Sequence, residues 1–430
     1  MLEKIKTFWF HSFLEERPSI SLSLFRPFVA FTVGAHMIPT LLHLSDNYLT
    51  GSFREKNPLF FTVGVLRLVD QSPDWLVVAF MVLFYASVSF FMVGLFSQGS
   101  CLAMMLSLYF FYALNCLHIG TLSFDILLVT LFLVAITSYP GDTFSIDSLR
   151  HPDPLAYKKK RPFFVQRLLQ LQIASTYFFT ALCKFTAQGN WFSDNPIYYL
   201  LNSPAEGVVK HFSLREFFAG QPSACYGIGI MMIAFEISMP FLLFMKRTRI
   251  FVIILGFLFH IMLVVTLHVP TIFFFLFPPQ LLLFIEPEKI VDFVDRQRGK
   301  NSNRNQDIVI FDGHCQFCIG SIEKLQTLDI FGKTKLLDYQ IFEDISSIDG
   351  RLTKEKCHSQ MHVLTAEREL FGGFYAFQYL SMRLPLLWIL VPLFYFPGMQ
   401  WVGSVIYSFI SKNRTLFHRK GACKNNQCFR

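Results

Sequence analysis

Charged residues are scarce in this sequence of 430 residues. Asp, Glu, Lys and Arg make up 16% of the chain, whereas about 25% is usual for a soluble domain. Hydrophobic residues make up 53%, and phenylalanine alone occurs 52 times. A chain with so few polar residues cannot cover the surface of a water-soluble protein of this size. The composition excludes soluble, disordered, collagen-like and coiled-coil proteins, and it predicts a membrane protein.

Two further shortages narrow the class of protein. Cysteine is too sparse for a disulfide-stabilised scaffold, with nine residues in the chain. A cleavable signal peptide is not expected, because charged residues recur as far as Arg26 and no small-residue cleavage site follows a short apolar run. The net charge is +8, but the basic residues lie beside apolar runs. We therefore expect membrane lipids as partners and no nucleic acid.

Eight apolar segments reach or approach the length that crosses a bilayer. They are residues 24–44, 75–96, 101–119, 122–139, 165–187, 226–245, 250–269 and 271–285. The last segment is short, and three arrangements fit its length: a span with little tilt, a span across a locally thinned bilayer, or a re-entrant segment. This pattern predicts a polytopic α-helical membrane bundle of about eight spans within residues 1–290.

The distribution of Lys and Arg predicts how the bundle is oriented. Alternate connections, residues 1–26, 150–167 and 246–249, hold thirteen Lys and Arg residues, whereas the opposite connections, 45–74 and 188–224, hold five. Basic residues concentrate on the cytoplasmic side of membrane proteins. With an even number of spans, both termini are expected to be cytoplasmic, in a multi-pass protein of the cell inner membrane.

The composition changes after the apolar segments. Residues 291–306 become charged and Asn-rich, as in a linker. Residues 307–430 then predict a small α/β domain of the thioredoxin-like kind: a strand at 308–311, a helix ending near Leu328, a strand at 335–339 and a hairpin within 361–373. Residues 384–410 are apolar enough for a ninth span. Because prolines and Gly398 interrupt them, two short helices on the domain or on the membrane surface are predicted instead.

The pair Cys315 and Cys318 is the sharpest local signal. It follows a predicted strand and opens a predicted helix, where free N–H groups and the helix dipole favour thiolate over thiol. Cys315 is the expected nucleophile, and Cys318, one turn later, is placed to resolve a mixed disulfide. Asp312, in the preceding turn, is a candidate proton acceptor or relay. These three residues are the predicted catalytic group of the domain.

Other interpretations of the cysteine pair stay open. It could be a metal-ligand pair, completed by Cys423 and Cys428, although a gap of roughly a hundred residues is unlike a zinc site. The pair could also have no chemical role. No proline precedes the strand at residues 361–364, where a thioredoxin-like site usually has one facing the dithiol.

Ionisable residues inside the apolar segments are few, and each is a candidate functional residue because burying charge there is costly. They include Asp125, Lys184, Glu236 and His260. Lys184 shares a helical face with Tyr177, and with Gln170 and Gln166 further up the same segment, so this polar stripe should face protein and not lipid. Two roles remain for Lys184: a snorkelling residue near the end of its span, or a buried base.

The membrane part resembles a known family. The segments YFFTALCKFTAQGNW (177–191), AFEISMPFLLFMKRTR (234–249) and FLFHIMLVV (257–265), with SLFRPFVAF (23–31), are similar to the HTTM domain, whose family includes the vitamin K-dependent γ-carboxylase. The resemblance implies that Lys184 is a catalytic base linked to hydroquinone oxidation, with Glu236 and His260 matching an acidic residue and a histidine. The lumenal part that holds the carboxylase's protein substrate has no counterpart here, so carboxylation of glutamate is not predicted.

Residues 308–430 resemble the DCC family of thiol-disulfide oxidoreductases. The resemblance rests on Asp312, Cys315 and Cys318, and on GGFYAFQYL (372–380) and YSFISKNR (407–414). The two resemblances together predict a membrane-bound redox protein. Its dithiol would exchange with a thiol or disulfide protein partner, and its membrane part would bind a quinone, a vitamin K-type hydroquinone or another lipidic substrate through Tyr177, Glu236, His260 and Asp125.

Two alternatives belong to other functional classes. The chain could be a transporter or peptide-export component that uses Asp125, Glu236 and His260 as a proton or ion path. It could also be a membrane scaffold without enzymatic activity.

Overall fold

The computed structural model describes residues 3, 10–50, 69, 72–115, 121–186, 191–192, 194–202, 217–218, 220–266, 272–302 and 306–414. These residues form two compact units. The first comprises Met1–Asp147 with Lys158–Ile290, and the second comprises Ser148–Tyr157 with Val291–Arg430. Some of the Lys and Arg residues counted above lie outside the described residues: Lys4, Lys6, Arg54, Lys56, Arg67, Lys210 and Arg215. Cys423 and Cys428, the residues of the zinc alternative, also lie outside them.

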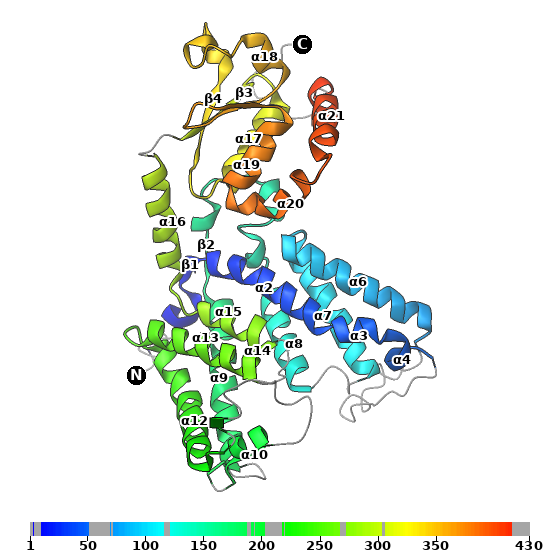
Figure 1. The fold of residues 1–430 in the computed structure, drawn as a ribbon, viewed down its shortest axis with the longest axis vertical. Helices are drawn as coiled ribbons and strands as arrows, with labels where there is room; N and C mark the ends of the chain where they lie inside the picture. Colours follow the sequence, from blue (N-terminus) through cyan, green and yellow to red (C-terminus); the bar gives the residue numbers. More distant parts are fainter. Residues whose placement is uncertain are drawn as a thin grey trace. The chain divides into compact units, whose positions relative to one another are not determined.

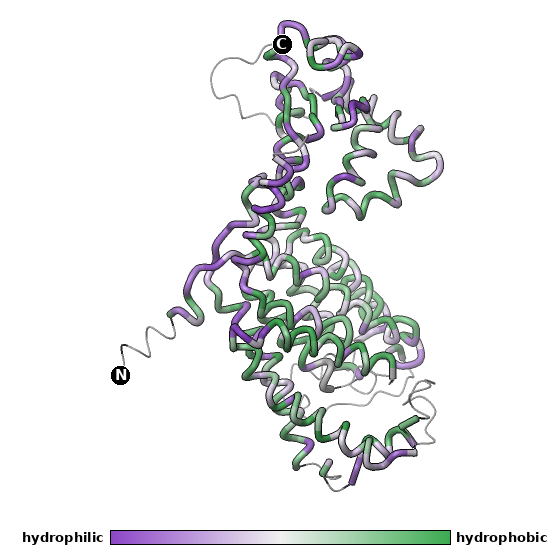
Figure 2. Tube along the Cα trace, turned by 60° about the vertical axis from the view of Figure 1, so that its left-hand side comes forward, coloured by the Kyte–Doolittle hydropathy of each residue, from purple (hydrophilic) through white to green (hydrophobic). Residues whose placement is uncertain are grey.

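The first unit is a helical bundle (Figure 1). Its longer helices are α2 (Ile20–His36), α6 (Asp74–Val93), α7 (Ser97–Leu114), α8 (Thr121–Ala135), α9 (Phe164–Thr186), α12 (Pro222–Phe244) and α13 (Arg249–Thr266). Its shorter helices are α3 (Ile38–Leu42), α4 (Leu44–Tyr48), α10 (Pro196–Asn202), α14 (Ile272–Phe275) and α15 (Phe277–Leu282). Helices α2, α6, α7 and α8 pack in succession, and α9 packs against α12 and α15. One hydrophobic core joins both groups. Figure 2 shows hydrophobic residues, in green, along much of the tube through these helices.

The predicted number of about eight spans is not confirmed. Four helices of the described residues are long and apolar enough to cross a membrane: Ile20–Leu42, Asp74–Val93, Ser97–Leu114 and Pro222–Phe244. Two predicted spans are shorter apolar helices, Asp125–Ala135 and Arg249–Val265, and the segment at 271–285 is divided into α14 and α15. Helix α9 is 23 residues long but carries the polar stripe, which lowers its hydropathy. Composition located the apolar segments, but breaks and polar faces decide which of them are continuous spans.

Basic residues at one end of this unit form ion pairs and hydrogen bonds with buried groups. Strand β1 (Glu16–Pro18) pairs antiparallel with β2 (Lys160–Pro162). Buried Asp142 accepts hydrogen bonds at 2.9 Å from Arg161 and Ser19, and pairs with Lys159 at 2.8 Å. The buried guanidinium of Arg26 donates to the carbonyls of Pro140, Thr143 and Phe144. The ion pairs of Asp142 and the hydrogen bonds of Arg26 hold the connection before α9 in place.

The segment expected as a linker is largely helical. Helix α16 spans Pro287–Ser302, so the charged run that begins at Arg296 continues a helix. Arg298 donates hydrogen bonds to the carbonyls of Asp329 and Ile330 at 3.3 and 3.1 Å, and Asp295 accepts one from Tyr157 at 2.6 Å. These tertiary contacts, which composition does not reveal, order the polar segment.

The second unit contains a four-stranded mixed sheet in the order β4-β3-β5-β6. Strands β3 (Asp307–Phe311) and β4 (Thr334–Asp338) are parallel, whereas β5 (His362–Leu364) pairs antiparallel with both β3 and β6 (Leu370–Gly372). The predicted strands and hairpin are all present. The parallel pair requires a crossover, which is α17 (Gln316–Leu328), the helix that the cysteine pair opens.

Two helices cover one face of this sheet, and α18 lies against the other. Val309 and Val363 pack with Ile322 of α17 and with Leu380 of α19 (Phe374–Arg383). On the opposite face, Ile310 packs with residues that include Cys357 of α18 (Lys354–Ser359).

The apolar tail of the second unit is broken, as predicted. Helix α19 is followed, after a bend of 119°, by a 3₁₀ turn (Pro385–Leu390) and α20 (Val391–Phe394). Helix α21 (Met399–Lys412) begins after Gly398, whose φ is +87°. If the bent pair were one broken span, the number of candidate spans in the described residues would rise from four to five.

Candidate functional site

The cysteine pair lies at the start of α17, as predicted. Strand β3 ends at Phe311, and Cys315 is the N-cap residue, with extended backbone angles. The Cys315 sulfur accepts a hydrogen bond from the backbone N–H of Cys318 at 3.4 Å, which satisfies one of the free N–H groups of the first turn. Both cysteines are free thiols and partly accessible. The pair therefore has the placement expected of a reactive dithiol.

The two thiols have different pKa values. A hydrogen bond from the Cys318 side chain lowers the pKa of Cys315 to about 6, against the opposing effect of burial, and the backbone N–H of Cys318 and the charge of Arg414 contribute in the same direction. The bond to Cys315 and burial both raise the pKa of Cys318. At neutral pH, Cys315 is therefore the thiolate and Cys318 the proton-bearing thiol. This polarity agrees with the roles expected from the order of the two residues.

The turn before the dithiol depends on Gly313. Its N–H donates a hydrogen bond of 2.9 Å to the carboxylate of Asp338 at the end of β4. A Cβ atom at this position would lie 1.9 Å from an Asp338 carboxylate oxygen. Only glycine lets the turn approach the neighbouring strand so closely, and this approach helps to place Asp312 and Cys315.

A charged cluster adjoins the dithiol. Asp312 is 5% exposed and accepts hydrogen bonds from the His314 N–H at 3.1 Å and from Gln340 at 3.0 Å. Arg414 lies 3.5 Å from the Asp312 carboxylate and 4.0 Å from the Cys318 sulfur. The guanidinium of Arg414 is also 3.1 Å from the ring of His358, whose Nδ1 is 3.7 Å from Asp312. Arg414 thus links the carboxylate to the second thiol.

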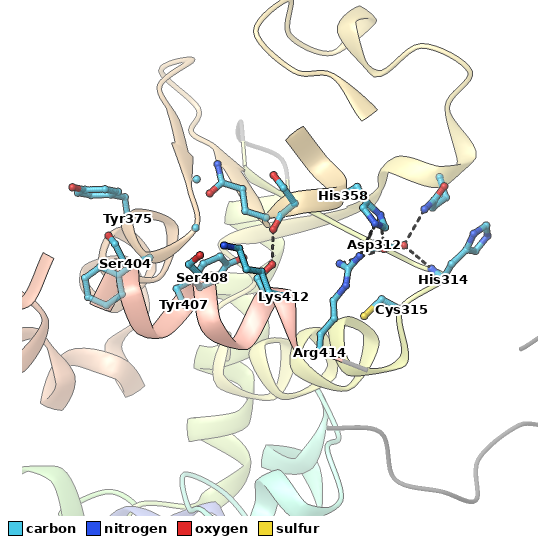
Figure 3. Close-up of a pocket in the computed structure, with 17 residues that line it drawn as sticks. Asp312, His314, Cys315, His358, Tyr375, Ser404, Tyr407, Ser408, Lys412 and Arg414 are labelled. Carbon is cyan, nitrogen blue, oxygen red and sulfur yellow. Dashed lines mark hydrogen bonds and ion pairs between the residues drawn. The ribbon is translucent and has the colours of Figure 1, made fainter. Parts of the chain in front are cut away.

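A pocket of about 920 Å³ opens beside this cluster. Figure 3 shows Cys315, Asp312, His358 and Arg414 on one side of it, and Tyr407, Ser408 and Lys412 of α21 on the other. Most of the residues that line the pocket are polar types, and two of them are basic, Lys412 and Arg414. Since Cys315 lines this pocket and Cys318 does not, a substrate in the pocket would meet Cys315 first.

Sequence reasoning missed part of this cluster. Arg414 falls in the segment YSFISKNR, which supported the resemblance, but its role did not follow from the segment. His358 and Gln340 come from α18 and from the turn after β4, and no spacing connects them to the cysteines. Among the described residues, no group of three or more His, Cys, Asp or Glu side chains is arranged to hold a metal ion.

In the first unit, the polar stripe of α9 faces protein, as predicted. Gln166, Gln170, Tyr177 and Lys184 are exposed by 2%, 4%, 6% and 9%. The first two donate hydrogen bonds to the carbonyl of Leu283, at 2.6 and 2.7 Å. That carbonyl lies just beyond the end of α15, where the helix itself offers it no donor, and the two glutamines supply its hydrogen bonds.

Two buried polar pairs continue the stripe. Lys184 makes an ion pair with Glu236 of α12, and its ammonium lies 5.0 Å from the ring centroid of Trp191. Tyr177 is hydrogen-bonded to His260 of α13. Glu236 and His260 are 4% and 1% exposed. A Lys184 paired in the interior does not match the snorkelling alternative, in which the ammonium reaches water.

Asp125 does not share this environment. Its side chain is exposed on α8, whereas Glu236 and His260 are buried between α9, α12 and α13. The structure therefore brings Lys184, Glu236, Tyr177 and His260 into one interhelical region and leaves Asp125 at the surface of its helix. A path through Asp125, Glu236 and His260 lacks geometric support.

Comparison with known proteins agrees with both halves of this description. The HTTM domain family matches residues 15–288, and the DCC1-like thiol-disulfide oxidoreductase family matches residues 309–420. No curated protein and no solved structure matches the chain. The first match covers more than half of the sequence and contains the Lys184–Glu236 and Tyr177–His260 pairs, and the second contains the dithiol and its cluster. The chain belongs to the HTTM family and carries a DCC1-like thiol-disulfide oxidoreductase domain in its C-terminal part.

Proposed function

We propose that this protein is a membrane-bound thiol-disulfide oxidoreductase whose reactive group is the Cys315–Cys318 dithiol. The observation that carries the proposal is the helix-capping position of Cys315, where the Cys318 N–H bonds its sulfur and the pKa is about 6. The pocket beside Cys315 gives a partner access to this sulfur. The partner is a protein that carries a thiol or a disulfide.

The exchange has two steps. The Cys315 thiolate attacks one sulfur of the partner's disulfide, which forms a mixed disulfide and releases one partner thiolate. Cys318 then loses its proton and attacks Cys315, which forms the Cys315–Cys318 disulfide and releases the second partner thiolate. Two electrons pass from the dithiol to the partner. With a reduced partner the same steps run in reverse.

The proton of Cys318 needs an acceptor in the second step, because a thiol with an ordinary pKa of ~8.5 is mostly protonated at neutral pH. Asp312 is the candidate: its carboxylate is buried, and Arg414 contacts both that carboxylate and the Cys318 sulfur. Asp312 accepts the proton, and Arg414 stabilises the Cys318 thiolate as it forms. Both side chains thereby promote resolution of the mixed disulfide.

Trapping of mixed disulfides tests the proposal. In Cys318→Ser, the second step is blocked, so covalent adducts through Cys315 should accumulate and disappear on reduction. Cys315→Ser should give none. Cys357→Ser is the matched control, because Cys357 is a buried cysteine of the same unit and should leave trapping unchanged. Absence of adducts in Cys318→Ser, or unchanged function of a strain carrying Cys315→Ser with Lys184→Ala, would favour the scaffold alternative.

For the membrane part, we propose a lipidic substrate or quinone that binds between α9, α12 and α13. The region combines aromatic rings with a buried ion pair, Lys184–Glu236. For Lys184 to act as a base, its proton must first leave, and Glu236 already accepts a hydrogen bond from it. Extraction and mass analysis of lipids and quinones from the purified protein would identify the ligand, and recovery of bulk phospholipid alone would count against a quinone.

The orientation is part of the same proposal: an inner-membrane protein with both termini and the dithiol unit in the cytoplasm, as the Lys/Arg asymmetry indicates. Single cysteines at Lys160 and Glu323, in a background without other cysteines, provide the test, because both positions are exposed. A membrane-impermeant maleimide should label them only after the cells are opened. Labelling in intact cells would reverse the orientation.

A further inference from the structure

A second pocket, of about 610 Å³, lies entirely in the first unit. It is bounded by residues 12–17, the start of α9, the turn between α12 and α13, and the segment after α15. Four basic residues line it: Arg17, Arg167, Lys246 and Arg249. Glu286 is the single carboxylate among the described lining residues. The pocket therefore has a surplus of positive charge.

Arg167 is the basic residue whose charge is least compensated. Its guanidinium lies 5.0 Å from the ring of Phe163 and 5.6 Å from the ring of Phe244. It donates to the carbonyl of Ser12 at 3.1 Å and to the Gln170 side chain at 2.7 Å, both of which are neutral. Within the part of the chain that the structure describes, no carboxylate lies within 4 Å of it. A half-buried guanidinium held rigidly beside a pocket is a ready anion ligand.

The nearby carboxylates are already shared. Glu286 lies 3.3 Å from Arg249 and 3.7 Å from Lys246, and it also contacts Lys289 at 3.6 Å. Arg17 is paired with Glu15 at 2.8 Å. One carboxylate facing three basic groups cannot neutralise them, so an additional anion in the pocket would relieve their mutual repulsion.

Apart from Ser12 and Gln170, the rest of the lining is apolar, and its edge continues onto exposed apolar surface. Phe13, Phe163, Phe244 and Phe284 contribute aromatic walls. Leu171, which also lines the pocket, is 41% exposed, and Met245 and Ile250 beside the basic turn are 51% and 50% exposed. In a protein with membrane-spanning helices, such residues contact acyl chains. The ligand that fits is an amphiphile with an anionic head.

We propose that this pocket binds the phosphate headgroup of an anionic membrane lipid. The phosphate contacts Arg167 and Arg249, Lys246 approaches from the exposed rim, and the acyl chains follow Leu171 and the apolar surface beside it. The proposal does not depend on the dithiol or on the Lys184 region. It gives the membrane part a lipid site at the end of the unit where α9 begins.

Titration of the purified full-length protein with phosphatidylglycerol, followed by native mass spectrometry, tests this site. Wild type should bind phosphatidylglycerol and bind phosphatidylcholine at least tenfold more weakly. Arg167→Gln should weaken phosphatidylglycerol binding by about tenfold, because a charge-assisted bond is lost. Lys246→Gln should weaken it by about fivefold. Lys160→Gln removes an exposed basic charge outside the pocket and should leave affinity unchanged.

The outcomes separate the alternatives. Equal binding of both lipids, or equal losses in Lys160→Gln and Lys246→Gln, would overturn the site. Inorganic phosphate is the second arm: if phosphate alone displaces phosphatidylglycerol at comparable concentrations, the acyl chains contribute nothing and the lipid assignment fails. Lys246 is 85% exposed, so its variant keeps the test decisive if Arg167→Gln fails to fold.

Discussion

The two units use buried charge in opposite ways. In the membrane unit, Lys184 and Glu236 form an ion pair, and Tyr177 and His260 form a hydrogen-bonded pair, all at most 9% exposed. In the dithiol unit, Asp312 is equally buried, but its partners Arg414 and His358 reach a pocket with room for a substrate. One region encloses its charges between helices, and the other directs them toward an accessible sulfur.

The difference follows from the surroundings. Between membrane helices, neither lipid nor apolar side chains can replace water as hydrogen-bond partners, so each polar group needs a fixed polar partner. At the edge of the sheet, water and the pocket remain accessible, so charge can be left to tune a reactive group. The comparison predicts that changes in the first region will mainly affect stability and that changes in the second will mainly affect reactivity.

The largest expected effect is the loss of one partner of the membrane pair. Glu236→Leu leaves Lys184 without its counter-charge in the interior and should destabilise the protein by about 3–5 kcal/mol, measured as unfolding in detergent. Lys184→Leu combined with Glu236→Leu should recover much of the loss, because no unpaired charge remains. Glu288→Gln, an exposed change, should have little effect. A double variant as unstable as the single one would mean that the pair itself is not the source of stability.

Conservative replacement of the same lysine sharpens this comparison. Lys184→Arg keeps the positive charge and can still pair with Glu236, so yield and unfolding should stay close to wild type, whereas Lys184→Ala should lower both. A guanidinium remains protonated and cannot act as a base, so lipid-linked chemistry that depends on Lys184 should be lost in Lys184→Arg despite normal folding. Full stability of Lys184→Ala would return support to the snorkelling alternative.

The sequence predicts local secondary structure well in this protein. The strand before Cys315, the helix after it and the hairpin at residues 361–373 follow from short periodic patterns and turn residues, and the structure contains them. The stripe on α9 was also predictable, because residues at helical spacing share a face whatever surrounds them. The predicted number of spans is not confirmed by the described residues, because hydropathy averages over breaks such as the one that divides α14 from α15.

A moderate effect is expected from the turn before the dithiol. Gly313→Ala places a Cβ against the Asp338 carboxylate, which must then move and weaken its bond to the Gly313 N–H. We expect a loss of about 1–3 kcal/mol in the stability of the dithiol unit and slower reaction of Cys315. Gly350→Ala is the matched control, since no atom lies within 4 Å of a Cβ at that position. If both glycine variants behaved alike, the close approach would not be what positions the turn.

The partners of the dithiol were beyond sequence reasoning for a physical reason. Arg414 is separated from Cys318 by almost a hundred residues, and the packing of α21 against α19 brings the two together. His358 and Gln340 likewise reach Asp312 from separate elements. Side-chain networks assembled in three dimensions leave no spacing in the sequence, so a motif can locate the nucleophile without revealing what tunes it.

The smallest expected effect concerns Arg414, and it distinguishes an electrostatic effect on the pKa of Cys315 from a structural role. Arg414 favours the Cys315 thiolate through its positive charge, but the hydrogen bond from Cys318 is the larger cause of the lowered pKa. Arg414→Gln should therefore raise the pKa of Cys315 above about 6 without restoring the value of a free thiol, ~8.5. Alkylation should slow severalfold near pH 6, where the thiolate fraction changes most, and should match wild type at alkaline pH, where both proteins are fully deprotonated.

The rate of Cys315 alkylation as a function of pH, in a Cys318→Ser background and in the parent, measures this shift directly. Lys324→Gln is the control, because Lys324 is an exposed charge on α17 itself and should not move the profile. A slower rate at every pH would mean that Arg414 acts on access or folding and not on charge. An unchanged profile would remove Arg414 from the group of residues that set the reactivity of the dithiol, leaving the hydrogen bonds from the side chain and backbone of Cys318 as the cause.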